Sequence, residues 1–364
     1  MRRYSRLAGA LLLALAGVPA KAEWIVPEVR QHGDWSVACD NALSCTAVSA
    51  SAAYGARVRA SDPGDLATPL LWVRREGGPF APVRVFVDLA VWGERRSVGL
   101  LTLHVFHDGD PERLGRAYRL IEREPGYYEL DTRDLAAFLV ESRESDRAAT
   151  RRADGTQHGL ITTAGMVAAL RYIDERQQRR GTVTAIYARG GTPARAIPAA
   201  PSRERIAVMR GGAPVTASTA EAAALSERYG YLCGTQTESR VLAWQAWVLA
   251  DGHRLWAAQC ELDGENPLTI WALTDRFGTQ VDFKLPRPEQ GRAPEDPALP
   301  NSRFDPATGQ LTALYRAGRH GDCGWQRRWA WTGREFAMID AVEMPACIVI
   351  VMPQWLQTYR AVPW

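Results

Sequence analysis

The sequence predicts an α+β protein, in which an N-terminal β-rich domain with two helices is followed by a mostly antiparallel β C-terminal domain. Three observations lead to this prediction. The chain has 364 residues, of which 46% are hydrophobic, and this suits about two globular domains. Short β-branched and aliphatic runs bounded by Gly, Pro and Asp recur along the chain. At two places in its first half, the apolar spacing changes to the period of a helix.

Residues 1–22 are predicted to be a secretory signal peptide. Three arginines precede an apolar run over residues 7–18, and the run is followed by an Ala-Lys-Ala cleavage pattern that ends at Ala22. The apolar run is too short for a membrane span, which needs about 20 residues, and no later stretch reaches that length. We therefore expect a periplasmic or secreted protein with no membrane span in the mature chain.

The charge of the mature chain argues against a nucleic-acid partner. The whole chain carries a formal net charge of +3, and residues 1–22 contain four basic and no acidic residues, so the rest carries −1. A protein near neutrality has no overall electrostatic field that attracts nucleic acid.

The six cysteines predict three disulfides. An even number of cysteines in an exported protein is typical of a disulfide framework, and six cysteines allow fifteen connectivities. We favour pairing in sequence order, because each bridge then encloses a short segment. The favoured pairs are Cys39–Cys45, Cys233–Cys260 and Cys323–Cys347. The alternative is a reactive thiol at Cys323, close to His320. No C-x-x-C pattern occurs, which excludes the usual thioredoxin-type, zinc-ribbon and c-type haem signatures.

The N-terminal domain is expected over residues 23–189. Aliphatic runs between turn residues predict its strands, which are 34–39, 45–49, 70–74, 83–91, 98–107, 118–123, 127–130 and, after the helices, 182–188. The last of these is expected to be a buried strand.

Two helices are predicted in this domain. The first begins at Leu135 and shows the i, i+3, i+4 apolar spacing of one helix face. The second has an apolar stripe over residues 166–173, and Thr163 can cap its N-terminus. Arg171 and Glu175 are spaced i, i+4 on the opposite, solvent-facing side.

A Pro- and Gly-rich segment over residues 190–224 is predicted to be a linker. The C-terminal domain is expected over residues 225–364, which hold nine of the thirteen tryptophans. Its predicted strands are 240–249, 254–261, 268–272, 281–285, 329–331 and 336–341. Many short strands separated by Gly turns favour a mostly antiparallel β domain.

Three stretches of the sequence carry a resemblance to a known family. They are DWSVACDN at residues 34–41 with Cys45 following, GMVAALRYIDERQQRRGTVTA at residues 165–185, and residues 304–347, which include FDPATGQLTALYRAGRHGDCGW, WAWTGREF and the late cysteine. With the six cysteines, the leader and the length, they resemble a family of exported bacterial proteins catalogued only as a domain of unknown function. The resemblance covers nearly the whole mature chain. It implies six characteristic cysteines and no established activity.

The chain departs from the family pattern at one place, and it also shows a second likeness. At residues 178–181 the chain has Gln-Arg-Arg-Gly where a Gln-Gly-Arg run would be expected, and we expect this change to affect surface chemistry rather than the fold. The W-x-V-x-C opening at residues 35–39 is also similar to the invasion-associated locus B family of exported proteins, over the N-terminal domain only. That second likeness would imply a role in envelope stress or host interaction.

The turn at residues 318–325 concentrates polar and aromatic side chains. In an enzyme, His320 could act as a base, Asp322 could orient it, and Arg319 could bind an anionic group. The favoured interpretation is a Gly-rich turn that passes close to a disulfide, with Asp322 bonded to backbone amides. Arg319, His320, Asp322 and Trp325 are the candidate binding residues, and no catalytic residue is assigned.

No metal site is predicted. His104 and His107 would point to opposite faces of a strand, so they cannot bind one metal ion together. The acidic residues at alternate positions over 108–112 lack the rest of a calcium-loop pattern, and a solvated loop is favoured there.

The sequence favours a non-enzymatic binding or envelope-associated protein whose partner is an envelope protein or a glycan, with no cofactor. The tryptophans Trp325, Trp329 and Trp331 could line a carbohydrate or peptide groove, although core packing of Trp329 and Trp331 is favoured. The G-x-S-x-G, H-E-x-x-H and phosphate-loop patterns do not occur. The alternative is a hydrolase-like enzyme with its site at the turn over residues 319–325.

Overall fold

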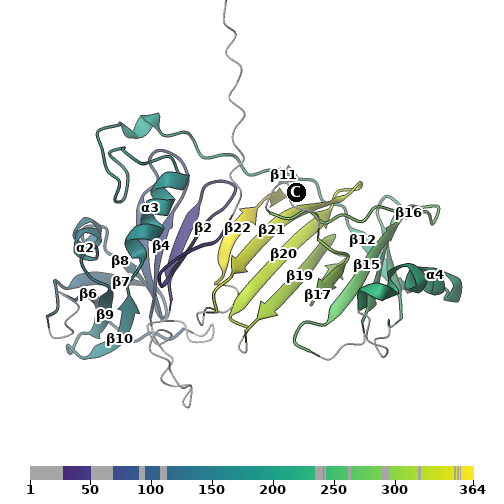
Figure 1. Cartoon of the computed structure of the whole chain (residues 1–364), viewed down its shortest axis with the longest axis horizontal. Coiled ribbons are helices and arrows are strands. Elements are labelled where there is room, and N and C mark those ends of the chain that lie inside the picture. The colour runs from purple at the N-terminus through teal and green to yellow at the C-terminus, as the bar shows by residue number, and fades with distance from the viewer. Residues whose placement is uncertain are drawn as a thin grey trace, which may run out of the picture.

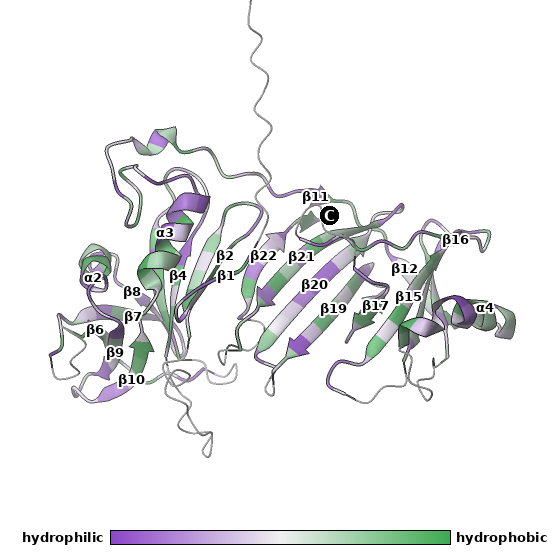
Figure 2. Ribbon diagram, viewed as in Figure 1, coloured by the Kyte–Doolittle hydropathy of each residue, from purple (hydrophilic) through white to green (hydrophobic). Residues whose placement is uncertain are grey.

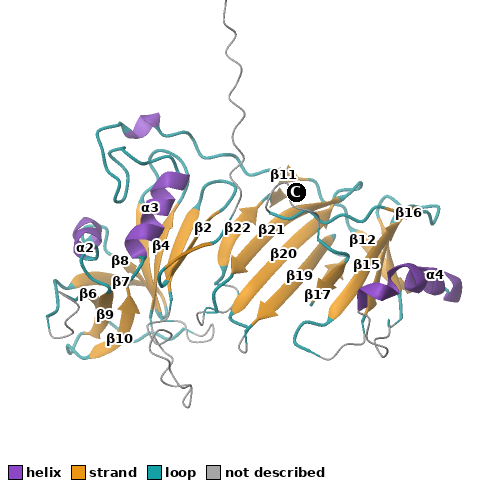
Figure 3. Ribbon diagram, viewed as in Figure 1, coloured by secondary structure: helices purple, strands orange, loops and turns teal. Residues whose placement is uncertain are grey.

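The computed structural model describes residues 28–50, 69–89, 95–106, 113–233, 241, 243–260, 264–288, 295–318, 321–347, 350, 352 and 354–364. The predicted signal peptide lies outside these residues. The described chain is mostly β, with antiparallel sheets and three α-helices (Figure 3). The predicted α+β class is therefore confirmed in its coarser form, as a β-rich protein with few helices.

The N-terminal part, residues 28–189, forms a ten-stranded antiparallel sheet in the order β1-β2-β3-β4-β5-β8-β7-β6-β9-β10 (Figure 1). Its strands are β1 (Arg30–His32), β2 (Trp35–Cys39), β3 (Cys45–Ser49), β4 (Leu70–Arg75), β5 (Val83–Asp88), β6 (Leu101–Val105), β7 (Tyr118–Glu124), β8 (Tyr127–Leu130), β9 (Arg147–Arg152) and β10 (Gln157–Thr162). The sequence predicted the first eight of these except β1, with shifts at some ends, and did not predict β9 or β10.

Both predicted helices of this part are confirmed, as α2 (Leu135–Glu141) and α3 (Met166–Arg176). The apolar stripe of α3 is buried except for the partly exposed Val167, and the helix packs against β1, β2 and β3. Capping by Thr163 is wrong: Gly165 is the N-cap, with φ 96°. A Cβ at Gly165 would lie 1.8 Å from the carbonyl oxygen of His32, so the helix start approaches β1 too closely for any other residue.

The predicted strand over residues 182–188 is wrong, because these residues form turns with one isolated bridge, Thr182 to Thr192. The cause is the carboxylate of Asp174 on α3. It accepts hydrogen bonds from the backbone amides of Ile186, Tyr187 and Ala188, at 2.8 to 3.3 Å. The segment is therefore wrapped around a side chain instead of pairing with a strand.

The C-terminal part contains two antiparallel sheets. The six-stranded sheet consists of β12 (Gly211–Thr216), β13 (Gln245–Leu249), β14 (Arg254–Gln259), β15 (Leu268–Thr274), β16 (Gln280–Val281) and β17 (Ala298–Pro300). The five-stranded sheet consists of β18 (Arg303–Asp305), β19 (Gln310–Ala317), β20 (Cys323–Trp331), β21 (Phe336–Met344) and β22 (Leu356–Arg360). Polar and apolar residues alternate over the first part of β19, where Leu311 and Ala313 are buried, and Figure 2 shows both kinds of residue along the strands of this sheet.

The two C-terminal sheets face each other across a core that includes Leu255, Trp271, Leu311, Trp329 and Trp331. The far side of the six-stranded sheet is covered by α4 (Thr219–Tyr229) and the short helix η3 (Gly230–Cys233) over a second apolar cluster. The core positions of Trp329 and Trp331 confirm the favoured interpretation of these residues.

The segment over residues 190–224 contains regular elements. They are the short helix η2 (Ala194–Ala196), β11 (Arg205–Ile206), β12 and the start of α4. β11 pairs in parallel with β23 (Val362–Pro363) at the C-terminus. The proposed boundaries of the two domains stay a prediction.

The three predicted disulfides are confirmed. Cys39 is joined to Cys45 across β2 and β3, Cys233 to Cys260, and Cys323 to Cys347. In the chain-entropy model, bridges of this kind contribute roughly 2–4 kcal/mol each.

One apolar cluster joins the N- and C-terminal parts, and we call it the junction cluster. Its N-terminal members lie on the face of the ten-stranded sheet away from α3: Ala38, Val48, Ala50, Leu70, Trp72, Phe86 and Tyr127. Its C-terminal members are Leu314, Met344, Ile350, Trp355 and Leu356. β22 accordingly lies beside β2 (Figure 1). From left to right in that view come α2 with β6, β9 and β10, then α3 beside β4 and β2, then the five-stranded sheet, and finally the six-stranded sheet and α4.

Candidate functional site

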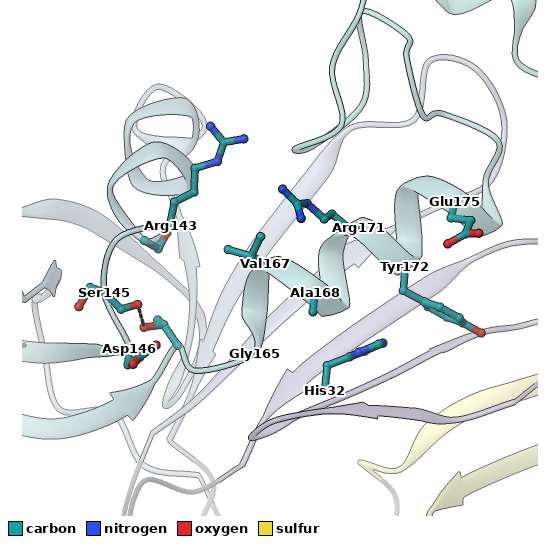
Figure 4. A pocket seen from close by; sticks show the side chains of 12 residues that line it. His32, Arg143, Ser145, Asp146, Gly165, Val167, Ala168, Arg171, Tyr172 and Glu175 are labelled. Atoms are coloured by element: carbon teal, nitrogen blue, oxygen red, sulfur yellow. Dashed lines mark hydrogen bonds between the residues drawn. The ribbon is translucent and has the colours of Figure 1, made fainter.

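An open cavity of about 520 Å³ lies along the outer face of α3, and we call it the α3 groove (Figure 4). Its walls come from β1, from the start of α3 and from the connection between α2 and β9. The lining residues are His32, Ser142, Arg143, Ser145, Asp146, Thr163, Gly165, Val167, Ala168, Arg171, Tyr172 and Glu175.

A network of hydrogen bonds fixes the groove where β1 meets α3. The amide of Asp34 donates to the carbonyl oxygen of Ala164 at 3.1 Å, and the hydroxyl of Thr162 donates to the Asp34 carboxylate at 2.7 Å. The indole Nε1 of Trp35 donates to the Thr162 carbonyl oxygen at 3.3 Å. The Asp-Trp pair that opens the family-like stretch is therefore used to hold the strand against the helix.

The groove presents charges of both signs that have no structural partner. The side chains of Asp146, Arg171 and Glu175 are exposed, and within the described chain they make no hydrogen bond or ion pair. Figure 4 shows Asp146 and Glu175 toward opposite ends of the groove, with Arg171 between them. Arg143 is used differently, because its guanidinium lies over the ring of Tyr187, 4.8 Å from the centroid.

His32 and Tyr172 supply the aromatic part of the groove. Their ring centroids are 6.0 Å apart, and the rings are tilted by 49°. Burial, with a smaller contribution from Arg30, lowers the pKa of His32 below its ordinary value, so the ring is neutral at neutral pH. Its Nε2 is buried and has no hydrogen-bond partner. A neutral imidazole in this position can donate to or accept from a polar ligand.

The candidate residues at the turn over residues 318–325 are only partly described. Arg319 and His320 lie outside the described residues. Asp322 is buried beside the Cys323–Cys347 disulfide, and a Cβ added at Gly318 would lie 3.0 Å from the Cys347 sulfur. This contact explains why glycine occurs there. The four residues together stay a prediction.

Trp325 is half-buried at the start of β20. Its ring stacks on Tyr315 of β19, with centroids 6.2 Å apart, and the guanidinium of Arg327 lies 4.5 Å from its centroid. Cross-strand pairing places Tyr315 opposite Trp325 and explains the stack.

Among the described residues, one group of three potential metal ligands lies close together. The one group with ligand atoms within 4.8 Å of one another is Asp322 with Cys323 and Cys347, and the two sulfurs are joined in a disulfide. Because metals bind the thiolate form of cysteine, this group does not make a metal site while the disulfide is intact. His104 hydrogen bonds to Thr102 at 2.9 Å, whereas His107 and residues 108–112 lie outside the described residues.

Sequence reasoning missed a buried polar cluster that consists of Arg75, Asp174, Gln177 and Arg179. Arg179 is fully buried, and its guanidinium donates to Gln177 at 2.9 Å, to Thr184 at 3.0 Å and to the Pro79 carbonyl oxygen at 3.2 Å. The expectation that residues 178–181 affect surface chemistry is therefore wrong for Arg179.

A signal for this cluster was present in the helix pattern. Asp174 is four residues after Leu170, so it continues the buried stripe of α3 with a carboxylate. Gln177 fastens the end of the helix, because its amide donates to three carbonyl oxygens, those of Leu43, Arg75 and Glu76. The cluster holds the scaffold behind the α3 groove and does not reach it.

Comparison with known proteins agrees with the resemblance to a family without established activity. A family model described as "Protein of unknown function (DUF1176)" matches residues 29–362. The chain is 26% identical over 348 aligned residues to the "Uncharacterized protein YpfG" of Escherichia coli (strain K12). The aligned region covers 93% of this chain and 94% of that protein. No solved structure matches. The likeness to invasion-associated locus B proteins is not confirmed. In the described residues no helix has the length and apolar character of a membrane span.

Proposed function

This chain belongs to the DUF1176 family of proteins of unknown function, and from that premise we propose that it is an exported, disulfide-stabilised binding protein whose ligand occupies the α3 groove. Export is supported by the leader pattern in residues 1–22 and by three disulfides, which persist in oxidising compartments such as the periplasm. Its role is binding rather than catalysis.

The observation that carries the proposal is the free charge around the groove. Elsewhere in the N-terminal part, charged side chains that are buried are fastened by partners, as Glu129 is by Arg84 and Arg123. Around the groove, Asp146, Arg171 and Glu175 keep their hydrogen-bonding capacity for a ligand. A cavity of about 520 Å³ lies within the size range of small-ligand sites.

The chemistry of the groove favours a peptide segment of another envelope protein as the ligand. The backbone amide groups of a peptide can form hydrogen bonds with His32 and Tyr172. Its acidic side chains can pair with Arg171, and its basic side chains can pair with the carboxylates of Asp146 and Glu175. A neutral glycan offers hydroxyl groups but would leave the three charges unpaired. A glycan is therefore the second outcome of the test.

The binding test uses the mature chain, residues 23–364, in a selection from a display library of random twelve-residue peptides and, in parallel, on a glycan array. Selected peptides are measured by fluorescence anisotropy. We expect R171E and E175K each to weaken binding at least tenfold. The matched control is R180E, because Arg180 is also exposed but does not line the groove. Binding that none of these variants changes would refute the groove as the site, and glycan hits that depend on Arg171 would replace the peptide with a sugar.

Export is tested separately. The full chain, expressed in a bacterium, should appear in the periplasm with the mass of residues 23–364. Retention of residues 1–22 in a cytoplasmic product would contradict export.

A further inference from the structure

The outer face of the five-stranded sheet carries a row of polar side chains across all five strands. The strand register pairs Arg303 with Thr312, Thr312 with Arg328, Arg328 with Asp340, and Asp340 with Arg360. Directly paired residues on neighbouring antiparallel strands project from the same face. The row therefore brings three arginines and a single aspartate together on one surface.

Apolar contacts cover this face on both sides of the row. Toward the N-terminal part, Leu314 and Met344 are buried in the junction cluster. On the other side, Ala330 and Ile339 are buried beneath β11 and the C-terminal strand, in a cluster with Ile206. Between these two covered regions lies an open cavity of about 250 Å³, lined by polar side chains of β18, β19 and β20.

The row and its cavity together carry three arginines, Arg303, Arg328 and Arg360, against two carboxylates, Asp305 and Asp340, so one positive charge is left without a counter-charge. The Asp340 carboxylate is shared by Arg328, at 3.3 Å, and Arg360, at 3.8 Å, and it also accepts a hydrogen bond from Gln357 at 3.1 Å. Arg303 makes no hydrogen bond or ion pair within the described chain, although its charge acts on the nearby Asp305 carboxylate.

Arg328 also keeps unused hydrogen-bonding capacity. Its Nε is buried without a hydrogen-bond partner, while the side chain as a whole is 41% exposed. The other carboxylate of the cavity, Asp305, accepts hydrogen bonds from its own turn, from the amide of Ala307 at 3.0 Å and the hydroxyl of Thr308 at 2.7 Å. The groups left for a ligand are therefore guanidinium donors.

We propose that this cavity is a second binding site, which takes a small ligand bearing a carboxylate or a phosphate on a polar, hydroxyl-rich body. Arg303 and Arg328 would bind the anionic group, because guanidinium groups donate paired hydrogen bonds to carboxylates and phosphates. Gln310, Thr312 and Gln326 in the same cavity supply neutral donors and acceptors for the body of the ligand. The site lies on a different sheet from the α3 groove and does not depend on it.

The test compares three ligands of one ring size against the mature chain: glucuronate, glucose 6-phosphate and glucose. Binding is measured by calorimetry and by the side-chain Nε–H resonances of arginine in NMR spectra. We expect at least one acidic sugar to bind at least tenfold more tightly than glucose and to shift the Arg328 Nε–H resonance. Preference for glucuronate would assign a carboxylate ligand, and preference for glucose 6-phosphate a phosphate ligand.

Substitutions locate the binding. R303Q and R328Q should each weaken the binding of the acidic sugar at least fivefold. R334Q should leave the affinity unchanged, because Arg334 lies on an exposed turn between β20 and β21 of the same sheet. Thermal melting checks that each variant is folded. The proposal is overturned if the acidic sugars bind no better than glucose. It is also overturned if R303Q and R328Q bind as the unmodified chain does, or if R334Q loses affinity to the same extent.

Discussion

The side-chain Oδ1 of Asn41 accepts a hydrogen bond of 2.9 Å from the backbone amide of Arg360, 319 positions along the chain. Two neighbouring contacts make the same connection, from Gln354 to Asp88 at 2.7 Å and from Arg203 to Asp40 at 3.1 Å. They surround the junction cluster, in which both parts of the chain bury apolar side chains. Because the parts share a core, we expect the described chain to unfold as one cooperative unit.

Trp355 tests this expectation, because it lies in the junction cluster, 4% exposed, with its Nε1 donating to the Ile350 carbonyl oxygen at 2.8 Å. W355A should lower the free energy of unfolding by about 3–5 kcal/mol, as is usual when a buried Trp is truncated. The measurement is urea unfolding followed by circular dichroism and fluorescence. W364A is the control, since Trp364 is 68% exposed, and it should cost less than about 1 kcal/mol. Separate transitions for the two parts, unchanged by W355A, would contradict a shared core.

Local patterns in the sequence predicted most strands of the N-terminal part, both of its helices and the disulfide pairing, because each depends on residues that are near in sequence. β9 was missed because it is made mostly of arginine and alanine, with Ala148 and Ala149 among its buried residues. β10 was missed because polar residues and a glycine fill its first half and leave only the short run Leu160–Thr162. β11 was missed because its partner, β23, is more than 150 residues away. Such pairings leave no local signal.

The α3 groove could be predicted only in part, for a similar reason. The exposed positions of Arg171 and Glu175 follow from the helical period and are confirmed. His32 and Asp146 join them only because Gly165 lets the helix start touch β1 and because the chain after α2 returns beside it. The buried Asp174 broke the expected strand over residues 182–188, since a carboxylate that binds three amides outweighs the β-propensity of that segment.

Gly165 should be essential for the shape of the groove. G165A places a methyl group against the His32 carbonyl oxygen at a backbone position with φ 96°, so we expect a loss of more than about 2 kcal/mol in stability and a displaced β1. G181A is a matched control: its φ is also positive, at 79°, but a Cβ there has nothing within 4 Å. It should cost only the backbone strain of about 1 kcal/mol. Equal losses in the two variants would mean that the helix start does not approach β1 in this way.

The carboxylate of Asp174 should be a main support of the scaffold behind the groove. It is fully buried, accepts three backbone amides and lies 3.7 Å from the buried guanidinium of Arg75. D174N replaces one carboxylate oxygen, an acceptor, by an NH2 group, which can only donate, and it leaves Arg75 without its counter-charge. Urea unfolding should therefore show that the free energy of unfolding falls by about 3–5 kcal/mol. E175Q, one residue further and exposed, should change stability by less than about 0.5 kcal/mol.

The unreduced mature protein should contain no free thiol. Alkylation under denaturing conditions followed by intact-mass measurement should give no adduct, because all six cysteines are bridged. After reduction the same treatment should add six alkyl groups. Two adducts without reduction would leave one bridge open, and the assignment of Cys323 to a disulfide would then have to be tested first by peptide mapping.

Stability should fall as the pH rises from 10 to 12, and Tyr187 should account for part of the loss. Its ring is buried, and burial raises the pKa of its hydroxyl from 10 to about 12. Between these values the unfolded chain has lost the proton and the folded chain keeps it. The unfolded state therefore binds fewer protons, and the free energy of unfolding decreases with pH. The contribution is fully present well below pH 10, and about 2 kcal/mol of it is lost by pH 12, with a limiting slope of about 1.4 kcal/mol for each pH unit.

Y187F removes this titration and keeps the ring against Arg143. We expect the variant to be within about 1 kcal/mol of the unmodified chain at pH 7, because the buried Tyr187 hydroxyl makes no well-formed hydrogen bond and only approaches the Ser142 side chain, whose own hydroxyl donates to the Phe138 carbonyl oxygen. Its urea midpoint should decline less steeply from pH 10 to pH 12. Y231F, in which the altered ring is 71% exposed, should follow the unmodified curve. If the urea midpoint of Y187F declines as steeply as that of the unmodified chain, the Tyr187 hydroxyl reaches water in the folded state. Residues 182–188 would then pack around Asp174 more loosely than the hydrogen bonds of Ile186 and Tyr187 indicate.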